Sequence, residues 1–273
     1  MKDIEIKDLR RITELVKDRY SYDFSNYAMS SFKRRVLRIL ELKQLSVENL
    51  IKKIESNPTF VEDFLSEITV NVTEMFRDPS FWRVLRDDII PAILLNNKSI
   101  KIWHAGCSSG EEVFSMAILL KEMGIYHDAT IIATDLDTVI LERAKKGTYP
   151  IKNMDLNSKN YIRYQGTKAL SEYYQEKKDK AVMDQSLLDN VSFRKHDLVT
   201  GQIFNKFDLV LCRNVMIYFN QNLQNVVLRK FHDSLFKYGY LAIGSKESLI
   251  WCDIANKFIV VNNEEKVYKK IKD

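Results

Sequence analysis

The sequence predicts an α/β fold with a mostly parallel sheet, preceded by an all-helical domain and interrupted by a small insert. Apolar residues recur at helical spacing from Ile4 to about Ser66, and after Lys98 short apolar runs alternate with amphipathic segments. A polar stretch between Tyr149 and Asn190 breaks this alternation. With 273 residues, 45% of them apolar, the chain has room for one large or two modest domains.

The N-terminal part is expected to be a small helical bundle. Its apolar residues follow a spacing of three and four, as in Leu9, Ile12 and Val16. No glycine precedes Gly106, and Pro58 is the only proline before Pro79, which favours helices joined by short polar connections. We therefore predict an N-terminal helical domain at residues 1–75 and a second domain at residues 76–273.

In the second domain, strand-like and helix-like segments alternate. Such an order predicts a parallel sheet covered by helices on both faces. We expect strands at residues 100–105, 129–134, 191–195, 207–212 and 240–244, and helices at 111–123, 138–145 and 221–236. A final pair, 258–261 and 266–271, is separated by Asn-Asn-Glu-Glu and predicts an antiparallel hairpin at the sheet edge. The stretch at about 150–190 fits neither sheet nor covering helices and is interpreted as an inserted subdomain, the alternative being a long surface loop containing a helix.

Composition and charge argue against several classes of protein. The three cysteines are far apart and form no ligand-spaced cluster with the four histidines, so we expect neither disulfides nor a metal site. The formal charge of +5 is too small to indicate a nucleic-acid partner by itself. No leader-like N-terminus and no membrane-length apolar run is seen, which predicts a cytoplasmic protein without membrane insertion.

A small-residue turn at 106–110 joins the first strand of the sheet to a helix. Gly106 and Gly110 permit a tight turn and a close approach of the backbone to a ligand. Glu111 and Glu112 at the helix start would repel a pyrophosphate, so a ligand with a cationic group fits better. Asp135 ends the next strand, where a carboxylate can accept hydrogen bonds from both hydroxyls of a ribose.

Two further strand ends complete the candidate site. The third strand ends at His196-Asp197-Leu198 and the fourth at Arg213-Asn214-Val215, and such ends converge at the switch region of an open α/β sheet. Adenosine with a positively charged amino-acid tail, which is S-adenosylmethionine, satisfies this set. Each polar residue also has a local alternative: Asp135 as a helix N-cap, Asp197 as a turn residue and Asn214 as a local cap.

Four sequence motifs resemble the CheR-type chemotaxis receptor methyltransferases over most of the chain. They are Thr-Val-Asn-Val-Thr-Glu-Met-Phe-Arg at 69–77, Ser-Ser-Gly-Glu-Glu at 108–112, Thr-Asp-Leu-Asp at 134–137 and Cys-Arg-Asn-Val-Met-Ile-Tyr-Phe at 212–219. The resemblance implies a Rossmann-like S-adenosylmethionine-dependent methyltransferase sheet with an antiparallel last strand, an N-terminal helical domain and a small inserted β-subdomain. It also implies the activity: methyl transfer to glutamate side-chain carboxylates of chemotaxis receptors, which forms methyl esters for sensory adaptation and leaves S-adenosylhomocysteine.

The same resemblance assigns roles to individual residues. Arg77 and Tyr218 would lie beside the reacting methyl group, and Glu112 would engage the cationic amino-acid end. At the third strand end, where the family usually has asparagine, this chain has Asp197. The implied cofactor contacts are Asn71, Thr73, Arg77, Glu112, Asp135, Asp197, Leu198, Asn214 and Val215.

This chemistry needs few catalytic groups. A glutamate carboxylate, with a pKa of about 4.3, is ionised at neutral pH and needs no general base. Positioning remains, and Arg77 with the Tyr218 hydroxyl can orient the carboxylate. Alternatively, Arg77 would only pair with Glu74 or Asp78 on the surface, and Tyr218 would be an ordinary half-buried aromatic residue.

The partner surface is expected on a basic helix. Lys33, Arg34, Arg35, Arg38 and Lys43 share one helical stretch with a single acid, Glu41. An acidic receptor bundle would dock there, unless the basic face is simply solvated. Some family members capture a receptor tail peptide with the insert, and Gln165-Gly166-Thr167, less glycine-rich here, hints that this chain does not.

The sequence suggests two rival functions. Enzymes that methylate base amino groups carry Asn or Asp, two prolines and an aromatic residue at the fourth strand end, where this chain has Arg213-Asn214-Val215-Met216. The other rival is a non-catalytic regulatory module that binds S-adenosylmethionine in a signalling pathway. Retention of both Arg77 and Tyr218 argues against it.

Overall fold

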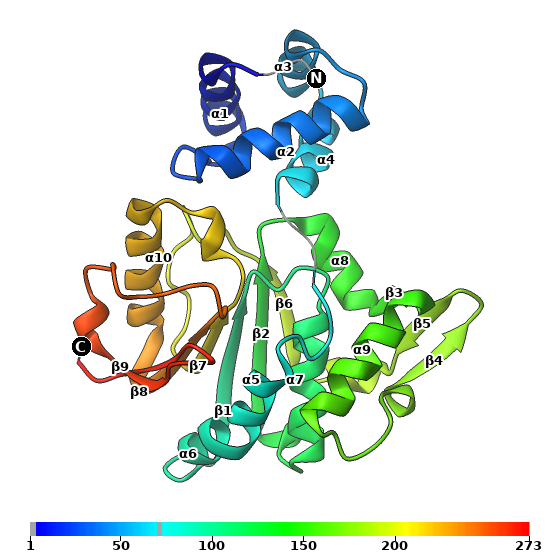
Figure 1. The fold of residues 1–273 in the computed structure, drawn as a ribbon, viewed down its shortest axis with the longest axis vertical. Helices are drawn as coiled ribbons and strands as arrows, with labels where there is room; N and C mark the ends of the chain where they lie inside the picture. Colours follow the sequence, from blue (N-terminus) through cyan, green and yellow to red (C-terminus); the bar gives the residue numbers. More distant parts are fainter. Residues whose placement is uncertain (1–3, 70–72, 273) are drawn as a thin grey trace.

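The computed structural model describes residues 4–69 and 73–272 and shows a helical domain seated on an α/β domain (Figure 1). The helical domain has its own apolar core, built around Leu9, Ile12, Phe32 and Phe64. Ser46 and Asn57 cap the third and fourth helices through their side chains. The four helices are α1 (Ile6–Tyr20), α2 (Met29–Leu42), α3 (Val47–Ser56) and α4 (Pro58–Ile68).

The main sheet has seven strands in the order β6-β2-β1-β7-β8-β10-β9. Five neighbouring strands run parallel, and β10 lies antiparallel to both β8 and β9, so the predicted antiparallel ending is confirmed. The strands are β1 (Ile100–Ala105), β2 (Ala129–Asp135), β6 (Val191–Lys195), β7 (Phe207–Cys212), β8 (Leu235–Ile243), β9 (Phe258–Asn262) and β10 (Val267–Lys270).

Successive residues of the central strands belong to two different apolar cores. Ile102 and Ile131 pack in one core, whereas their neighbours Trp103 and Ile132 pack in the other. This alternation is what a sheet covered on both faces requires. The covering elements are α5 (Pro79–Val84), the π-helical turn η1 (Leu85–Ile89), α6 (Ile90–Leu94), α7 (Glu111–Glu122), α8 (Thr138–Lys146) and α10 (Gln221–Ser234).

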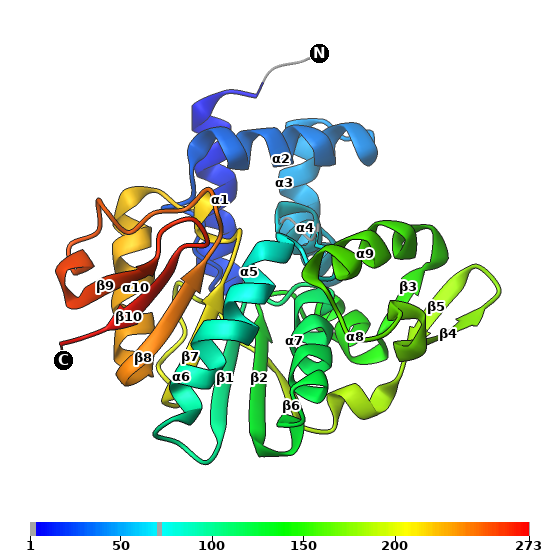
Figure 2. The same ribbon diagram turned by 60° about the horizontal axis from the view of Figure 1, so that its bottom comes forward.

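The insert is a small antiparallel sheet with one helix, which excludes the long-loop alternative. Strands β3 (Thr148–Pro150), β4 (Tyr174–Lys177) and β5 (Lys180–Met183) pair in the order β3-β5-β4. Figure 2 shows this sheet and the β9–β10 hairpin at opposite sides of the molecule.

The helix of the insert, α9 (Ile151–Tyr164), is not separate from the covering helices, as the sequence led us to expect. Its residues Tyr161 and Tyr164 are fully buried and pack on Phe76, with ring centroids 5.0 and 4.7 Å away. The polar character of the surrounding sequence masked this apolar face.

One predicted boundary between a helix and a strand is wrong. The helix expected over 221–236 ends at Ser234, and the strand expected from residue 240 begins at Leu235. Leu235 is buried and pairs with Phe207 at the start of β7, before an irregularity that shifts the register. Leu235 and Phe236 satisfy the apolar pattern of the helix as well, so periodicity could not separate the two elements.

Among the described residues, no helix is both long and apolar enough to cross a bilayer.

Candidate functional site

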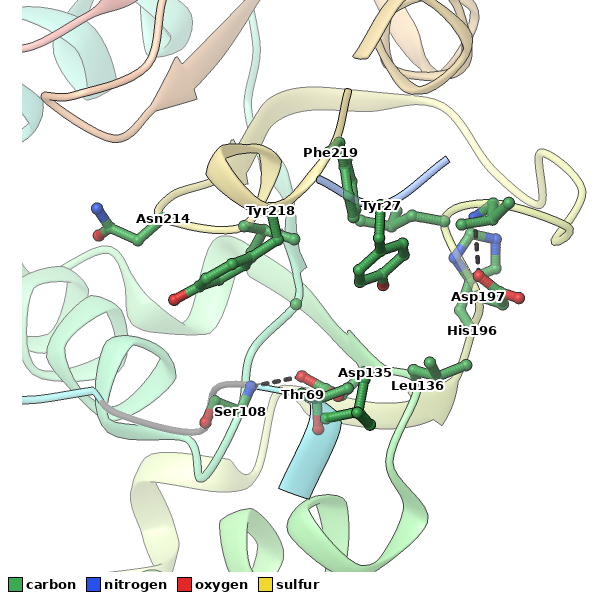
Figure 3. A pocket seen from close by; sticks show the side chains of 15 residues that line it. Tyr27, Thr69, Ser108, Asp135, Leu136, His196, Asp197, Asn214, Tyr218 and Phe219 are labelled. Carbon is green, nitrogen blue, oxygen red and sulfur yellow. Dashed lines mark hydrogen bonds between the residues drawn. The ribbon is translucent and has the colours of Figure 1, made fainter. Parts of the chain in front are cut away.

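The carboxyl ends of β1, β2, β6 and β7 surround a pocket beneath the helical domain (Figure 3). We call it the strand-end pocket. Apolar side chains line much of it, and polar groups come from the strand ends. Its lining residues are Tyr27, Ile68, Thr69, Gly106, Ser108, Asp135, Leu136, His196, Asp197, Leu198, Val199, Asn214, Val215, Tyr218 and Phe219.

A second, more polar hollow adjoins the first and shares Gly106, Ser108, Asn214 and Val215 with it. We call it the arginine pocket. Its other lining residues are Thr73, Glu74, Arg77, Trp82, Cys107, Glu112 and Arg213. The two pockets together place a carboxylate-bearing apolar chamber beside a chamber with two guanidinium groups.

Close packing against Val215 and Ala144 explains both glycines of the turn after β1. Gly106 and Gly110 have φ angles of 78° and 92°. A Cβ on Gly106 would lie 2.7 Å from a methyl group of Val215, and one on Gly110 would lie 2.9 Å from the Cβ of Ala144. Any side chain at either position would therefore clash as well as strain the backbone.

Asp135 ends β2 and is 8% exposed. One carboxylate oxygen accepts a hydrogen bond from the Ser108 N–H at 2.8 Å and the other accepts from the Asp137 N–H at 3.1 Å. Burial raises the pKa of Asp135 to about 6, although these hydrogen bonds oppose the shift. The N-cap of α8 is Asp137 and not Asp135. Asp135 instead lines the strand-end pocket.

At the third strand end, the turn role of Asp197 is confirmed. Its carboxylate accepts hydrogen bonds from the Val199 N–H at 2.8 Å and the Thr200 hydroxyl at 2.7 Å. Asp197 and Leu198 nevertheless line the strand-end pocket. His196 lines it too, and burial lowers the pKa of its imidazole.

Glu112 lies in the first turn of α7, inside the arginine pocket. Its carboxylate accepts a hydrogen bond from His104 Nδ1 at 2.8 Å and lies 3.4 Å from the Arg213 guanidinium. Burial raises the pKa of Glu112, but these two neighbours outweigh burial and leave the pKa below its ordinary value. The position expected to meet a cationic group thus holds an ionised carboxylate.

Arg213 was not singled out from the sequence as a site residue. Its side chain is 2% exposed and forms an ion pair with Asp78 at 2.6 Å as well as with Glu112. Its guanidinium also lies over the Phe81 ring, 3.9 Å from the centroid. A cation directly after a buried apolar strand was the available signal, because such a residue needs buried partners.

Arg77 lines the arginine pocket, and its carbonyl accepts a hydrogen bond from the Trp82 indole at 2.9 Å. Within the described part of the chain, no ion pair joins its guanidinium to Glu74 or Asp78. Tyr218 ends the short turn η5 (Met216–Tyr218) and directs its hydroxyl away from Tyr27, towards the side of Asn214 (Figure 3). Burial raises the pKa of Tyr218, opposed by the charges of Arg35 and Arg77.

Asn214 adopts a left-handed backbone conformation, with φ of 62°. A buried carboxylate, Glu247, fixes it by accepting the Asn214 N–H and the Ile217 N–H, both at 3.1 Å. Burial raises the pKa of Glu247. Asn214 does not act as a helix cap, and Glu247, which the sequence did not single out, supports the turn that carries Tyr218.

Of the other residues predicted from the sequence, Thr73 lines the arginine pocket and Val215 lines both pockets. Asn71 lies outside the described residues. On α2, Arg34 and Arg38 are exposed, and Arg38 lies 3.7 Å from Glu67.

Comparisons with known proteins point in one direction. A family profile described as CheR methyltransferase, SAM binding domain, matches residues 71–267, and one described as CheR methyltransferase, all-alpha domain, matches residues 7–69. The chain is 41% identical over 269 residues to the putative methyltransferase Cher3 of Pseudomonas putida, covering 98% of this chain and 97% of that protein. It is 34% identical over 247 residues to the chemotaxis protein methyltransferase of Listeria innocua, covering 89% and 91%.

A similar solved structure is the N-methyltransferase NodS of Bradyrhizobium japonicum in complex with S-adenosylhomocysteine. Its sequence identity is 11% and its TM-score 0.40, over 72% of this chain and 91% of that one.

Proposed function

Since the chain belongs to the CheR methyltransferase family, we propose that it transfers a methyl group from S-adenosylmethionine to glutamate carboxylates of chemotaxis receptors. The family accounts for S-adenosylmethionine as cofactor and for chemotaxis receptors as methyl acceptors. The glutamate oxygen as the methylated atom is our own inference. One observation carries it: Arg77 and Tyr218 border adjoining pockets, and Arg77 has no carboxylate partner among the described residues.

The carboxylates and apolar side chains of the two pockets fit S-adenosylmethionine in chemistry and in order. Asp135 offers a carboxylate to ribose hydroxyls, and Leu136 and Leu198 offer apolar surface to an adenine ring. Glu112, kept ionised, offers charge to the ammonium group of the amino-acid end. Bound there, the cofactor supplies a methyl group on a positively charged sulfur.

The chain's own residues then have a positioning task. The acceptor carboxylate is ionised at neutral pH, so no side chain has to remove a proton. Arg77 can bind its charge, and the Tyr218 hydroxyl, whose raised pKa keeps it protonated, can donate a hydrogen bond to it. Holding the carboxylate in line with the methyl group accounts for several kcal/mol of the barrier, on the order of what proximity effects supply.

We further propose that the acceptor approaches along α2. Burial raises the pKa of Tyr218, and the nearby charges of Arg34 and Arg35 oppose this rise, so the N-terminal half of this helix borders the site. A helix rich in carboxylates would find Lys33, Arg34, Arg35 and Arg38 on this path. An acceptor that approaches along α2 would reach Arg77 and Tyr218, which argues against a non-catalytic module.

The test is transfer of radiolabelled methyl from S-adenosylmethionine to membranes that contain chemoreceptors, followed by mild alkali. Esters release the label as methanol, whereas N-methyl groups do not. We expect alkali-labile label, reduced about 100-fold in Arg77→Ala, since that variant loses the group that orients the acceptor carboxylate. Arg194→Ala, an exposed arginine on β6, is the matched control and should transfer normally. Alkali-stable label would contradict glutamate as the acceptor.

A further inference from the structure

Tyr27 comes from the connection between α1 and α2 in the helical domain, yet it lines the strand-end pocket of the other domain. Its ring makes edge contacts with Phe24, 4.9 Å away, and with Phe219, 5.1 Å away. Phe24 belongs to the core of the helical domain and Phe219 to the core under α10. Tyr27 therefore packs against both domains at once.

Backbone hydrogen bonds fix this position. The Ala28 N–H donates to the Tyr218 carbonyl at 2.8 Å, and the Asn220 N–H donates to the Asn26 carbonyl at 2.9 Å. Between them, Tyr27 and Phe219 form an antiparallel bridge. We call this pairing of 26–28 with 218–220 the domain clasp. It holds the Tyr27 ring against the segment that carries Tyr218.

The Tyr27 hydroxyl points into the strand-end pocket, on the side of Asp135 and Leu136 (Figure 3). Burial, together with the charges of Asp197 and Asp135, raises the pKa of Tyr27, so the hydroxyl is a permanent donor. None of the described residues accepts a hydrogen bond from it. The Asp197 carboxylate accepts hydrogen bonds from the Val199 N–H and the Thr200 hydroxyl, not from Tyr27.

We propose that Tyr27 is a cofactor-binding residue whose ring closes the adenosine end of the pocket and whose hydroxyl donates to a nitrogen or oxygen of the adenosine. The helical domain then supplies a wall of the cofactor site, and seating of the two domains is coupled to cofactor binding. α2 begins two residues later, at Met29. This inference requires cofactor binding alone and is independent of which acceptor atom is methylated.

Calorimetric titration with S-adenosylhomocysteine and with 5′-methylthioadenosine tests the proposal on the full chain. Tyr27→Ala should weaken binding of both ligands by about tenfold or more, as expected for a lost aromatic wall. Tyr27→Phe keeps the ring and should weaken both by about three- to tenfold, the effect of one hydrogen bond. Equal losses for both ligands place the contact at the adenosine end, which they share.

The matched control is Tyr22→Phe. Tyr22 also joins the domains, through a hydrogen bond from Lys195 Nζ at 2.6 Å, but it does not line the pocket. Normal binding in this variant supports a direct contact by Tyr27. Unchanged binding in folded Tyr27→Ala would overturn the proposal, as would an equal loss in Tyr22→Phe or a loss limited to S-adenosylhomocysteine. Failure of receptor methylation would leave these binding results standing, so the two proposals fail separately.

Discussion

Among single residues, Asp135 and Glu247 show how buried carboxylates set the geometry of the site. Both accept backbone N–H groups, and burial raises the pKa of both. Asp135 thereby ties the glycine turn to the end of β2, and Glu247 ties the turn after β7 to the loop after β8. The difference lies in access, because Asp135 faces the pocket and Glu247 does not line it.

For Asp135 we expect a pH-dependent affinity for the cofactor. Its pKa of about 6 means that the carboxylate gains a proton as pH falls through 6 and then accepts fewer hydrogen bonds from a ribose. The dissociation constant of S-adenosylhomocysteine should therefore rise between pH 7.5 and pH 5, with a midpoint near 6. Calorimetry across this range measures it, and Asp135→Asn should bind weakly with no such midpoint. A flat profile in the unaltered protein would contradict this role.

For Glu247 we expect a loss of turnover with the fold retained. Glu247→Gln places an amide NH₂ against backbone N–H groups that now share a carboxylate, so the turn carrying Tyr218 should shift. Methyl transfer should fall about tenfold, a change of about 1.4 kcal/mol. Initial rates measure this, with circular dichroism as the check on folding. Glu264→Gln, at an exposed position of the β9–β10 connection, should leave the rate unchanged.

The site residues at the strand ends could be predicted from the sequence, but the residues that support them could not. Asp135 ends the buried strand β2 and Asp197 follows the edge strand β6, which is a local signal, and both line the pocket. The partners of Arg213 are distant in the chain, since Asp78 lies 135 positions away. Glu247 and Tyr27 likewise act on the segment 214–220 from remote elements, and nothing in local sequence specifies such contacts.

Among the elements, Arg213 joins the end of β7 to α7 and to the loop before α5. Its removal would leave Glu112 and Asp78 without their shared cation, so Arg213→Ala should cost about 3 kcal/mol of the free energy of unfolding. Urea unfolding followed by circular dichroism measures this. The control is Arg229→Ala on α10, which removes an exposed pair with Asp253 and should cost less than about 1 kcal/mol. Similar losses of unfolding free energy in both variants would contradict the role of Arg213 as a buried cation shared by Glu112 and Asp78.

Element type was predictable where one periodicity prevailed. β1, with its buried residues, and α2, with its amphipathic pattern, follow the sequence closely. The α10–β8 junction did not, because Leu235 satisfies both patterns and its pairing with Phe207 decides the outcome. For α9, contact with Phe76 turns a polar-looking helix into part of the core.

For the whole molecule, the alternation of strands and helices predicted a parallel sheet, and the sheet is confirmed. The seating of the helical domain over the carboxyl edge was not predicted. It depends on pairing between 26–28 and 218–220, two segments without a local pattern that identifies them. The boundary at residue 75 stays a prediction.

The charge distribution implies that acceptor and cofactor respond differently to salt. Exposed charges are screened within about 8 Å at physiological ionic strength, so the KM for receptor membranes should rise with added salt while S-adenosylhomocysteine affinity stays nearly constant. Arg34→Glu should raise the KM at low salt, and Lys52→Glu, at an exposed position of α3, should not. A KM that changes neither with salt nor with Arg34→Glu would contradict docking of the acceptor on α2.

The domain clasp also bears on how such a protein can be rearranged in evolution. Two domains joined only by a linker can be inherited, fused or lost independently. Here the segment that carries Tyr218 is hydrogen-bonded to the segment that leads into α2. We therefore expect the two domains to be inherited and exchanged between proteins as one unit.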